Sequence, residues 1–359
     1  MQTKVLPTMN KKHTIKDIAK LAGVSKGTVD RVLHKRGYVS RASFEKINDV
    51  LKIIDYKPNL IARNLRNNKN YNISIMLPDP KIDAYWLACI KGIEDAVNEF
   101  KAYNLSIGIF YFNPEKRKSF LKTSEKVFAL APDAVLLAPI FHKETLEVIQ
   151  KYNSNNIIVN TFNNQVESSL VKSFIGQDLF RSGRVGAKLL DSIAEPSQIA
   201  IIHIDEDYKN AIHMQEKERG FRMYFEEKEN GSNITTLKLK HPNIELNFNA
   251  FLDENPDLSG IFITTSKGYQ IAKRIGEVKG KKIRVVGYDL IDENIVYLQQ
   301  GIIDFIIHQN QKGQAYFGLT SLIEYFLFQK EIPERILLPI DIVNSENSKY
   351  YTRSSHLYL

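Results

Sequence analysis

The apolar residues of the first sixty positions recur with the period of short helices. An apolar face at spacings of three and four residues predicts a helix between Thr14 and Gly23, because Thr14 can cap its start and glycine readily takes the left-handed conformation that ends it. A second apolar face predicts a helix over about 26–33, after Ser25, and a third predicts one over about 41–55. Together these elements predict a small three-helix bundle.

From position 72 onward, short apolar runs alternate with amphipathic helical segments. The runs that predict strands are 73–77, 105–112, 134–138, 157–161, 198–204, 260–264, 282–287 and 302–307. The segments that predict helices are 84–103, 115–130, 142–152, 179–193 and 211–227, with further helices between the later strands. Such alternation is typical of βαβ units with parallel strands. The predicted class is therefore α/β, and about 285 residues are enough for two lobes with a cleft between them.

The second predicted helix carries polar and basic residues on the side away from its apolar face. Lys26, Gly27, Thr28 and Arg31 lie on that side, and His34 follows one turn later. Side chains on the first turns of a recognition helix reach the base edges of DNA, while flanking Lys and Arg meet phosphates. The pattern indicates a helix-turn-helix, although an ordinary helical hairpin within a larger domain has the same periodicity.

The charge of the chain is concentrated at its beginning. Residues 1–70 hold 16 Lys and Arg against 5 Asp and Glu, whereas the remaining 289 residues hold 33 against 36. A basic end on a slightly acidic body is typical of a tethered nucleic-acid-binding module. A ribosomal or membrane-surface protein would more often spread its positive charge along the chain.

Several kinds of chemistry find no support in the sequence. The one cysteine, Cys89, excludes an intramolecular disulfide and a zinc finger. Motifs for dinucleotides, phosphate-binding loops and serine hydrolases do not occur, and His203 and Asp205 have no third metal ligand in view. We therefore expect no cofactor, no metal and no catalytic residue.

No apolar run approaches the roughly 18 residues of a membrane span, and the first residues show no signal peptide, so we expect a cytoplasmic protein without a membrane partner.

The run DIAKLAGVSKGTVDRVL, residues 17–33, resembles the DNA-binding headpiece of the LacI/GalR family of bacterial transcription regulators. The resemblance extends to the segment 59–67, which is similar to the hinge helix that inserts a leucine into the minor groove; an ordinary linker is the alternative there. The DNA contacts that the resemblance implies are Thr14, Ser25, Lys26, Gly27, Thr28, Arg31, His34, Asn59, Arg63 and Leu65.

The rest of the chain resembles the effector domain of that family, which has the fold of periplasmic binding proteins. The best matching runs are 175–183 and 285–289, with a moderate match at 309–313. The resemblance implies three connections between two lobes, near 174–177, 303–310 and 341–344. The domains that it implies are a headpiece at 1–57, a hinge helix or linker at 58–70 and a core at 71–359, with lobe 1 at about 71–174 and 308–341 and lobe 2 at about 177–305 and 343–359.

Candidate ligand contacts follow the ends of the predicted strands, where open α/β sheets bind ligands. Asp83, Tyr85 and Trp86 suit a sugar, because aromatic faces stack on its ring and carboxylates accept from its hydroxyls; Trp86 could equally be a core anchor. The resemblance adds Asn163, Asp178, Lys217, Asp289 and Gln309.

Three features of these positions leave the ligand open. Asp178 directly precedes a predicted helix and could instead cap it. Lys217 stands where many relatives have an arginine, and lysine cannot form the same two-pronged contact, so Arg219 is an alternative. Residues 264–266, Thr-Thr-Ser, also replace the more usual amide and carboxylate pair. For these reasons the sequence does not name the sugar.

The resemblance implies a sequence-specific DNA-binding transcriptional regulator, in the manner of a repressor. It would act as a homodimer through its core, with operator affinity controlled by a small sugar-like ligand between the lobes. A sugar-binding transport or chemoreceptor protein of the same fold is an alternative. A further alternative is a sugar-modifying enzyme fused to a DNA-binding domain, for which Asp83, Asp178 and Asp289 would supply carboxylates.

Overall fold

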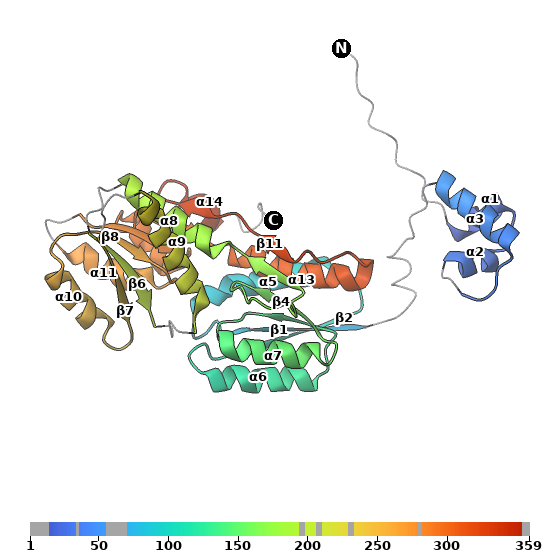
Figure 1. Cartoon of the computed structure of the whole chain (residues 1–359), viewed down its shortest axis with the longest axis horizontal. Coiled ribbons are helices and arrows are strands. Elements are labelled where there is room, and N and C mark those ends of the chain that lie inside the picture. Colours follow the sequence, from blue (N-terminus) through green and yellow to red (C-terminus); the bar gives the residue numbers. More distant parts are fainter. Residues whose placement is uncertain are drawn as a thin grey trace, which may run out of the picture. The chain divides into compact units, whose positions relative to one another are not determined.

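The computed structural model describes residues 14–33, 36–54, 70–193, 198–205, 210–228, 233–278 and 282–353. The chain divides into two compact units, residues 1–63 and 64–359, and each is described by itself (Figure 1). The expected contacts His34, Asn59, Arg63 and Leu65, and the expected hinge helix, lie outside the described residues.

The first unit contains the three predicted helices, α1 (Ile15–Ala22), α2 (Lys26–Leu33) and α3 (Arg41–Ile53). The Thr14 hydroxyl accepts the backbone N–H of Asp17, whose carboxylate accepts the N–H of Thr14, so both first-turn donors are satisfied. The backbone at Gly23 is left-handed, with a φ of 64°, and it ends α1 as the sequence predicts. The small core that the helices share consists of Ile18, Ala19, Ala22, Val29 and Ile47.

The second unit is built on two six-stranded sheets (Figure 1). The first sheet has the order β11-β5-β4-β3-β1-β2, with strands β1 (Tyr71–Pro78), β2 (Leu105–Phe112), β3 (Ala134–Leu137), β4 (Ile158–Phe162), β5 (Ser173–Gly176) and β11 (Arg335–Leu337). The second has the order β12-β10-β9-β8-β6-β7, with strands β6 (Gln198–Ile204), β7 (Asn233–Leu239), β8 (Leu258–Ile263), β9 (Arg284–Tyr288), β10 (Phe305–His308) and β12 (Asp341–Val343). Neighbouring strands pair in parallel except β10 and β12.

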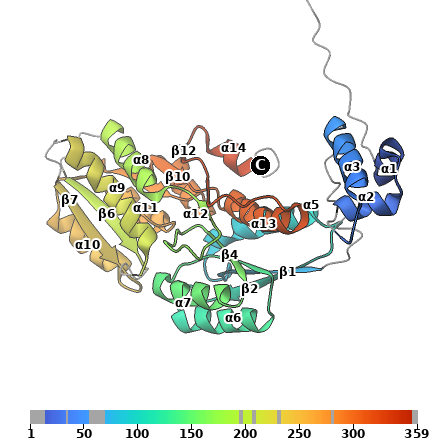
Figure 2. The same ribbon diagram turned by 45° about the vertical axis from the view of Figure 1, so that its right-hand side comes forward.

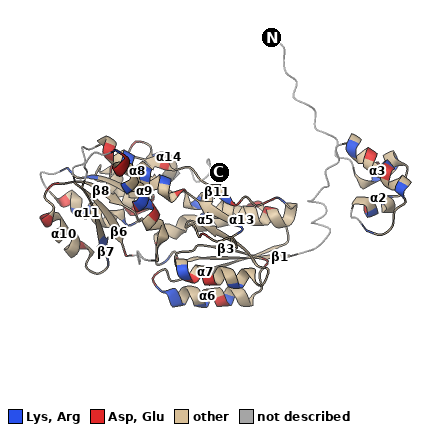
Figure 3. Ribbon diagram, viewed as in Figure 1, with Lys and Arg blue, Asp and Glu red and all other residues tan. Residues whose placement is uncertain are grey.

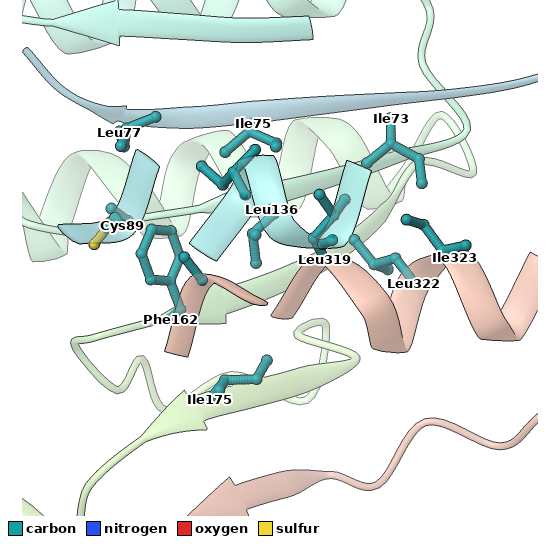
Figure 4. Packing of buried hydrophobic residues seen from close by; sticks show 14 of the residues in the cluster. Ile73, Ile75, Leu77, Cys89, Leu136, Phe162, Ile175, Leu319, Leu322 and Ile323 are labelled. Carbon is teal, nitrogen blue, oxygen red and sulfur yellow. The ribbon is translucent and has the colours of Figure 1, made fainter. Parts of the chain in front are cut away.

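Helices cover both faces of each sheet (Figures 1 and 2). Those of lobe 1, the part built on the first sheet, are the short 3-10 helix η1 (Ala84–Trp86), α5 (Leu87–Glu99), α6 (Arg117–Ala129), α7 (His142–Asn153) and α13 (Gln311–Phe328). Those of lobe 2 are α8 (Leu179–Ile193), α9 (Ile212–Lys228), α10 (Ile244–Glu254), α11 (Gly268–Glu277), α12 (Asp292–Gln299) and α14 (Ser348–Arg353). Figure 4 shows one apolar core of lobe 1, in which side chains of β1 meet those of α13.

The chain passes three times between the sheets. It leaves the first sheet after Gly176, returns after His308, and leaves again between Leu337 and Asp341. The first two passages fall where the resemblance implies them. The third lies at 338–340, a few residues before the expected range, because β12 already pairs with β10 from Asp341 onward.

Some elements of lobe 2 and of the sheet edges have no counterpart in the predicted pattern. The edge strand β7 is half exposed and rich in Thr and Lys, so it shows no apolar run, and α10 follows it. The helix expected over 84–103 is divided, because Asp83 caps η1 and α5 starts only at Leu87. Helix α5 ends at Glu99, and the ring of Phe100, the next residue, is buried in the core.

Candidate DNA interface and ligand site

The start of α2 is the part of the first unit that carries the expected DNA contacts. The Ser25 hydroxyl accepts the backbone N–H of Thr28 at 3.1 Å and so caps this helix. Lys26, Gly27 and Arg31 are exposed, whereas Val29 is buried against α1 and α3. The charged residues of this unit are coloured in Figure 3. The helix therefore presents a polar and basic side, which is the arrangement that a recognition helix needs.

Two of the expected DNA contacts also have a local structural role. Thr14 uses its hydroxyl in the capping box with Asp17, and the Ser25 hydroxyl caps α2. Both residues are exposed. A Cβ added at Gly27 would stand 3.7 Å from the Ser25 Oγ. Because glycine lacks this Cβ, the DNA backbone could approach the helix closely at this position.

The second unit contains a cavity of about 330 Å³ lined by residues of both lobes. Of the eight expected ligand contacts, seven line it: Asp83, Tyr85, Trp86, Asn163, Lys217, Asp289 and Gln309. They follow the carboxyl ends of strands of the two sheets, with Lys217 on α9. The cavity thus brings together residues that are up to 226 positions apart in the sequence, between Asp83 and Gln309.

The lobe 1 side of the cavity includes two aromatic rings and an amide. The Asn163 side-chain N–H donates to the hydroxyl oxygen of Tyr85. Burial raises the pKa of Tyr85 well above its ordinary value, so its hydroxyl stays protonated. The hydroxyl can therefore donate a hydrogen bond to a ligand oxygen. Trp86 is 3% exposed and packs edge-on against Tyr85 and Phe162, so it is a core anchor that also lines the cavity.

The lobe 2 side of the cavity includes a buried carboxylate and a buried ammonium group. Asp289 accepts from the side-chain amides of Gln309 and Gln311, and burial raises its pKa to about 7 while the nearby charge of Lys217 opposes that rise. Lys217 is 2% exposed, and its Nζ donates to the Thr264 carbonyl oxygen at 3.0 Å. The same Nζ lies 3.7 Å from the centre of the Tyr288 ring, a cation–π contact.

Asp178 is the expected ligand contact that the structure does not place on the cavity. Its Oδ1 accepts the backbone N–H of Arg181 at 2.8 Å, so it caps the start of α8. Capping thus explains the position of Asp178, and its contact with a ligand stays a prediction. Arg219, the alternative to Lys217, also lies off the cavity: it pairs with Glu216 and its guanidinium stacks on the ring of Phe180.

The cavity is also lined by polar residues outside the eight expected contacts, among them the Thr-Thr-Ser run at 264–266 noted in the sequence. They are Glu115, Arg117, Asn164, Asp205, Asn210, His213, Lys240, Thr264, Thr265, Ser266 and Lys267. Asp205 and Thr264 directly follow strand ends, so the rule that ligands bind there could have found them. Lys240 follows β7, the strand that the apolar pattern does not predict.

Comparison with known proteins adds to this geometry. The family model for a periplasmic binding protein domain matches residues 73–330, and the model for bacterial regulatory proteins of the lacI family matches residues 14–59. The chain belongs to the LacI family of bacterial regulatory proteins. It is a DNA-binding transcription regulator of that family, with the α/β two-lobe fold that the sequence predicts.

Relatives of this LacI-family protein include two operon repressors. The ribose operon repressor of Halalkalibacterium halodurans is 26% identical over 77% of this chain and 80% of its own length. The sucrose operon repressor of Streptococcus mutans is 25% identical over 92% of this chain and 98% of its own length. Both names describe those proteins, and this chain is similar to them.

Solved structures match the second unit. A crystal structure described as that of a LacI transcriptional regulator from Bacteroides fragilis has a TM-score of 0.75 and 28% identity, and covers 79% of this chain and 100% of its own. The glucose-galactose binding protein GanP from Geobacillus stearothermophilus has a TM-score of 0.67 and 20% identity, and covers 78% of this chain and 99% of its own. The second likeness shows the fold alone. Among the described residues, no helix is both long and apolar enough to cross a membrane.

Proposed function

We propose that this LacI-family protein is a homodimeric repressor whose affinity for operator DNA changes when a small sugar-like molecule binds between its lobes. The observation that carries the proposal is the presence, in one chain, of a capped helix with an exposed basic side and a cavity divided between two lobes. Binding to DNA places its action in the bacterial cytoplasm, on the nucleoid.

The DNA side of the proposal assigns roles to residues of α2. Lys26, Gly27 and Arg31 are exposed at this helix and are the base-proximal candidates, since Arg and Lys bind guanine through the major groove. The resemblance adds Asn59, Arg63 and Leu65 in the segment outside the described residues, with Leu65 as the wedge that kinks the central base step. Two copies would read the halves of a near-palindromic site.

The ligand side of the proposal is a polyhydroxyl compound. Asp289 supplies a carboxylate, Tyr85 a hydroxyl and Trp86 an aromatic surface around the cavity, which are the groups that bind a sugar's hydroxyls and its apolar ring face. The names of the two repressor relatives make ribose and sucrose reasonable first probes. The proposal does not rest on either sugar.

The test is a selection of genomic DNA fragments by the purified full-length chain at moderate salt, followed by sequencing of the retained fragments. We expect a shared near-palindromic site. Retention without a shared sequence, lost steeply as salt rises, would instead indicate unspecific phosphate binding. Arg31→Ala should reduce enrichment of the shared site, whereas Lys52→Ala, which removes a positive charge from the last turn of α3, is the matched control.

A sugar-binding transport protein is the second candidate function, because proteins of that class share the two-lobe fold, as GanP does. It predicts sugar binding with no sequence preference on DNA. Enrichment of a shared DNA site by the full-length chain would exclude the transport function. Turnover of a bound sugar would instead favour the enzyme alternative.

A further inference from the structure

The three connections between the lobes meet at one buried side chain. Gln177, in the first connection, is 1% exposed. Its Nε2 lies 2.9 Å from the carbonyl oxygen of His308, where the second connection begins, and 2.5 Å from that of Pro339 in the third. Both partners are acceptors, so the NH2 end of the amide must face them, and both of its protons are used. One amide group therefore ties the three connections together.

A backbone hydrogen bond joins two of these connections at the same place. The N–H of Leu338 donates to the carbonyl oxygen of Gly176 at 2.8 Å, next to Gln177. The connections are thus held here by the Gln177 side chain and by main chain, while Ile340 of the third connection packs against an apolar core of lobe 2. Such a tied bundle is the geometry of a pivot, because a rotation of one lobe against the other has to pass through it.

A second contact between the lobes lies away from this bundle. The Asn210 side chain, in lobe 2, accepts the backbone N–H of Lys143 at 3.1 Å and donates to Glu144 at 3.0 Å, both in the first turn of α7 of lobe 1. Asn210 follows β6, whereas the connections lie at β5, β10, β11 and β12, on the other side of the sheets. A small rotation about the pivot therefore produces a larger displacement at Asn210.

We propose that Gln177 is a positioning residue for the ligand site: it sets the angle at which the two lobes present their halves of the cavity. Gln177 does not line the cavity, while Tyr85 and Asn163 line it from lobe 1, and Lys217 and Asp289 from lobe 2. Because these halves belong to two lobes joined through the pivot, we expect loss of the tie to let the lobes take a wider range of angles. The importance of this angle for function rests on the proposed function, whereas the effect of Gln177 on the angle between the lobes does not depend on it.

The test measures the distance between the lobes directly. Spin labels replace the exposed residues Lys126 of α6 and Glu254 of α10, one on each lobe, and pulsed electron resonance gives the distance distribution in the full-length chain without DNA or sugar. Gln177→Met keeps most of the side-chain volume and removes both donated bonds. We expect a broader and shifted distribution than in the wild-type background.

The matched control is Gln198→Met. The Gln198 amide donates to Asn255 within lobe 2, so its loss should lower the melting temperature without changing the distance between the lobes. Gln177→Asn is the second variant: it keeps a buried amide but is one methylene too short to reach both carbonyl oxygens, and it should also broaden the distribution. A folded Gln177 variant whose distribution coincides with that of the wild type would overturn the inference. Because no DNA or sugar is present, this result is independent of whether the chain binds an operator.

Discussion

The side-chain amide of Gln311 donates to the carboxylate of Asp289 across the two lobes, over 2.8 Å. Asp289 directly follows β9 in lobe 2, and Gln311 is the first residue of α13 in lobe 1. Gln309, in the connection between them, donates to the same carboxylate at 3.1 Å. Since Asp289 also lines the cavity, a ligand hydroxyl that binds it competes with these amides. The carboxylate is therefore a point at which ligand binding can alter the contact between the lobes.

The first prediction concerns the pH dependence of stability. The pKa of Asp289 is about 7 in the folded chain, against 3.8 as its ordinary value, so between these values the folded state binds more protons than the unfolded state. The contribution of Asp289 to the free energy of unfolding is therefore fully present below about pH 4 and is lost as the pH rises through about 7. Over this range the free energy of unfolding falls by at most ~1.4 kcal/mol per pH unit. Asp289→Asn should remove this slope in urea unfolding measured from pH 4 to 8. Parallel curves for the variant and the wild type would contradict the assignment.

A second prediction concerns Gln311. Its amide stabilises the charged form of Asp289, so Gln311→Met should move the window of pH-dependent stability to higher pH. The matched control is Gln314→Met, since Gln314 is buried in the same helix but donates to the carbonyl oxygen of Gln309. The same series of urea curves is the measurement. An equal shift in both variants would assign the effect to general loosening of α13.

A third prediction concerns the close packing of α8 on α9. A Cβ at Gly183 would stand 2.0 Å from the carbonyl oxygen of Lys217, so Gly183→Ala should force the two helices apart and destabilise the chain by roughly 1–3 kcal/mol. Gly287→Ala is the control, because a Cβ there meets nothing within 4 Å and the backbone φ is not positive. Chemical denaturation compares the two. Equal stability of the variants would show that the helices separate at no cost.

Much of the architecture was predictable because periodicity and capping are local. The capping box at Thr14, the stop at Gly23 and the alternation from position 72 onward all follow from residues a few positions apart. The edge strand β7 was not predictable, because half of an edge strand faces solvent and its Thr and Lys side chains break the apolar run. Because β7 was not predicted, Lys240, which follows this strand and lines the cavity, was not predicted as a strand-end residue either.

The site was predictable in its strand-end residues and not in its contacts between distant segments. Seven expected residues line the cavity because the carboxyl ends of strands converge there. The sequence left two roles open for Asp178, and the bond from the Arg181 N–H shows the capping role. The tie made by Gln177 joins positions up to 162 residues apart, which no local pattern can reveal.

A fourth prediction concerns base reading by Arg31. If its exposed guanidinium makes a two-pronged contact with a guanine, Arg31→Ala should lose roughly 1–3 kcal/mol of discrimination between the selected site and its mismatched variants. The measurement is a set of equilibrium titrations with the site and with single-base substitutions. Equal weakening on specific and random DNA would assign Arg31 to phosphate binding instead. Lys52→Ala should change neither the affinity nor its sequence dependence.

We expect the full-length chain to bind one DNA sequence in preference to others. The most direct measurement is the ratio of its affinities for the selected site and for a scrambled duplex of equal length, at a salt concentration near 0.15 M. We expect the selected site to bind at least ~10³-fold more tightly, as sequence-specific regulators do. A ratio near one, with both affinities falling steeply as salt rises, would contradict the account and leave a basic helical module that binds phosphates alone.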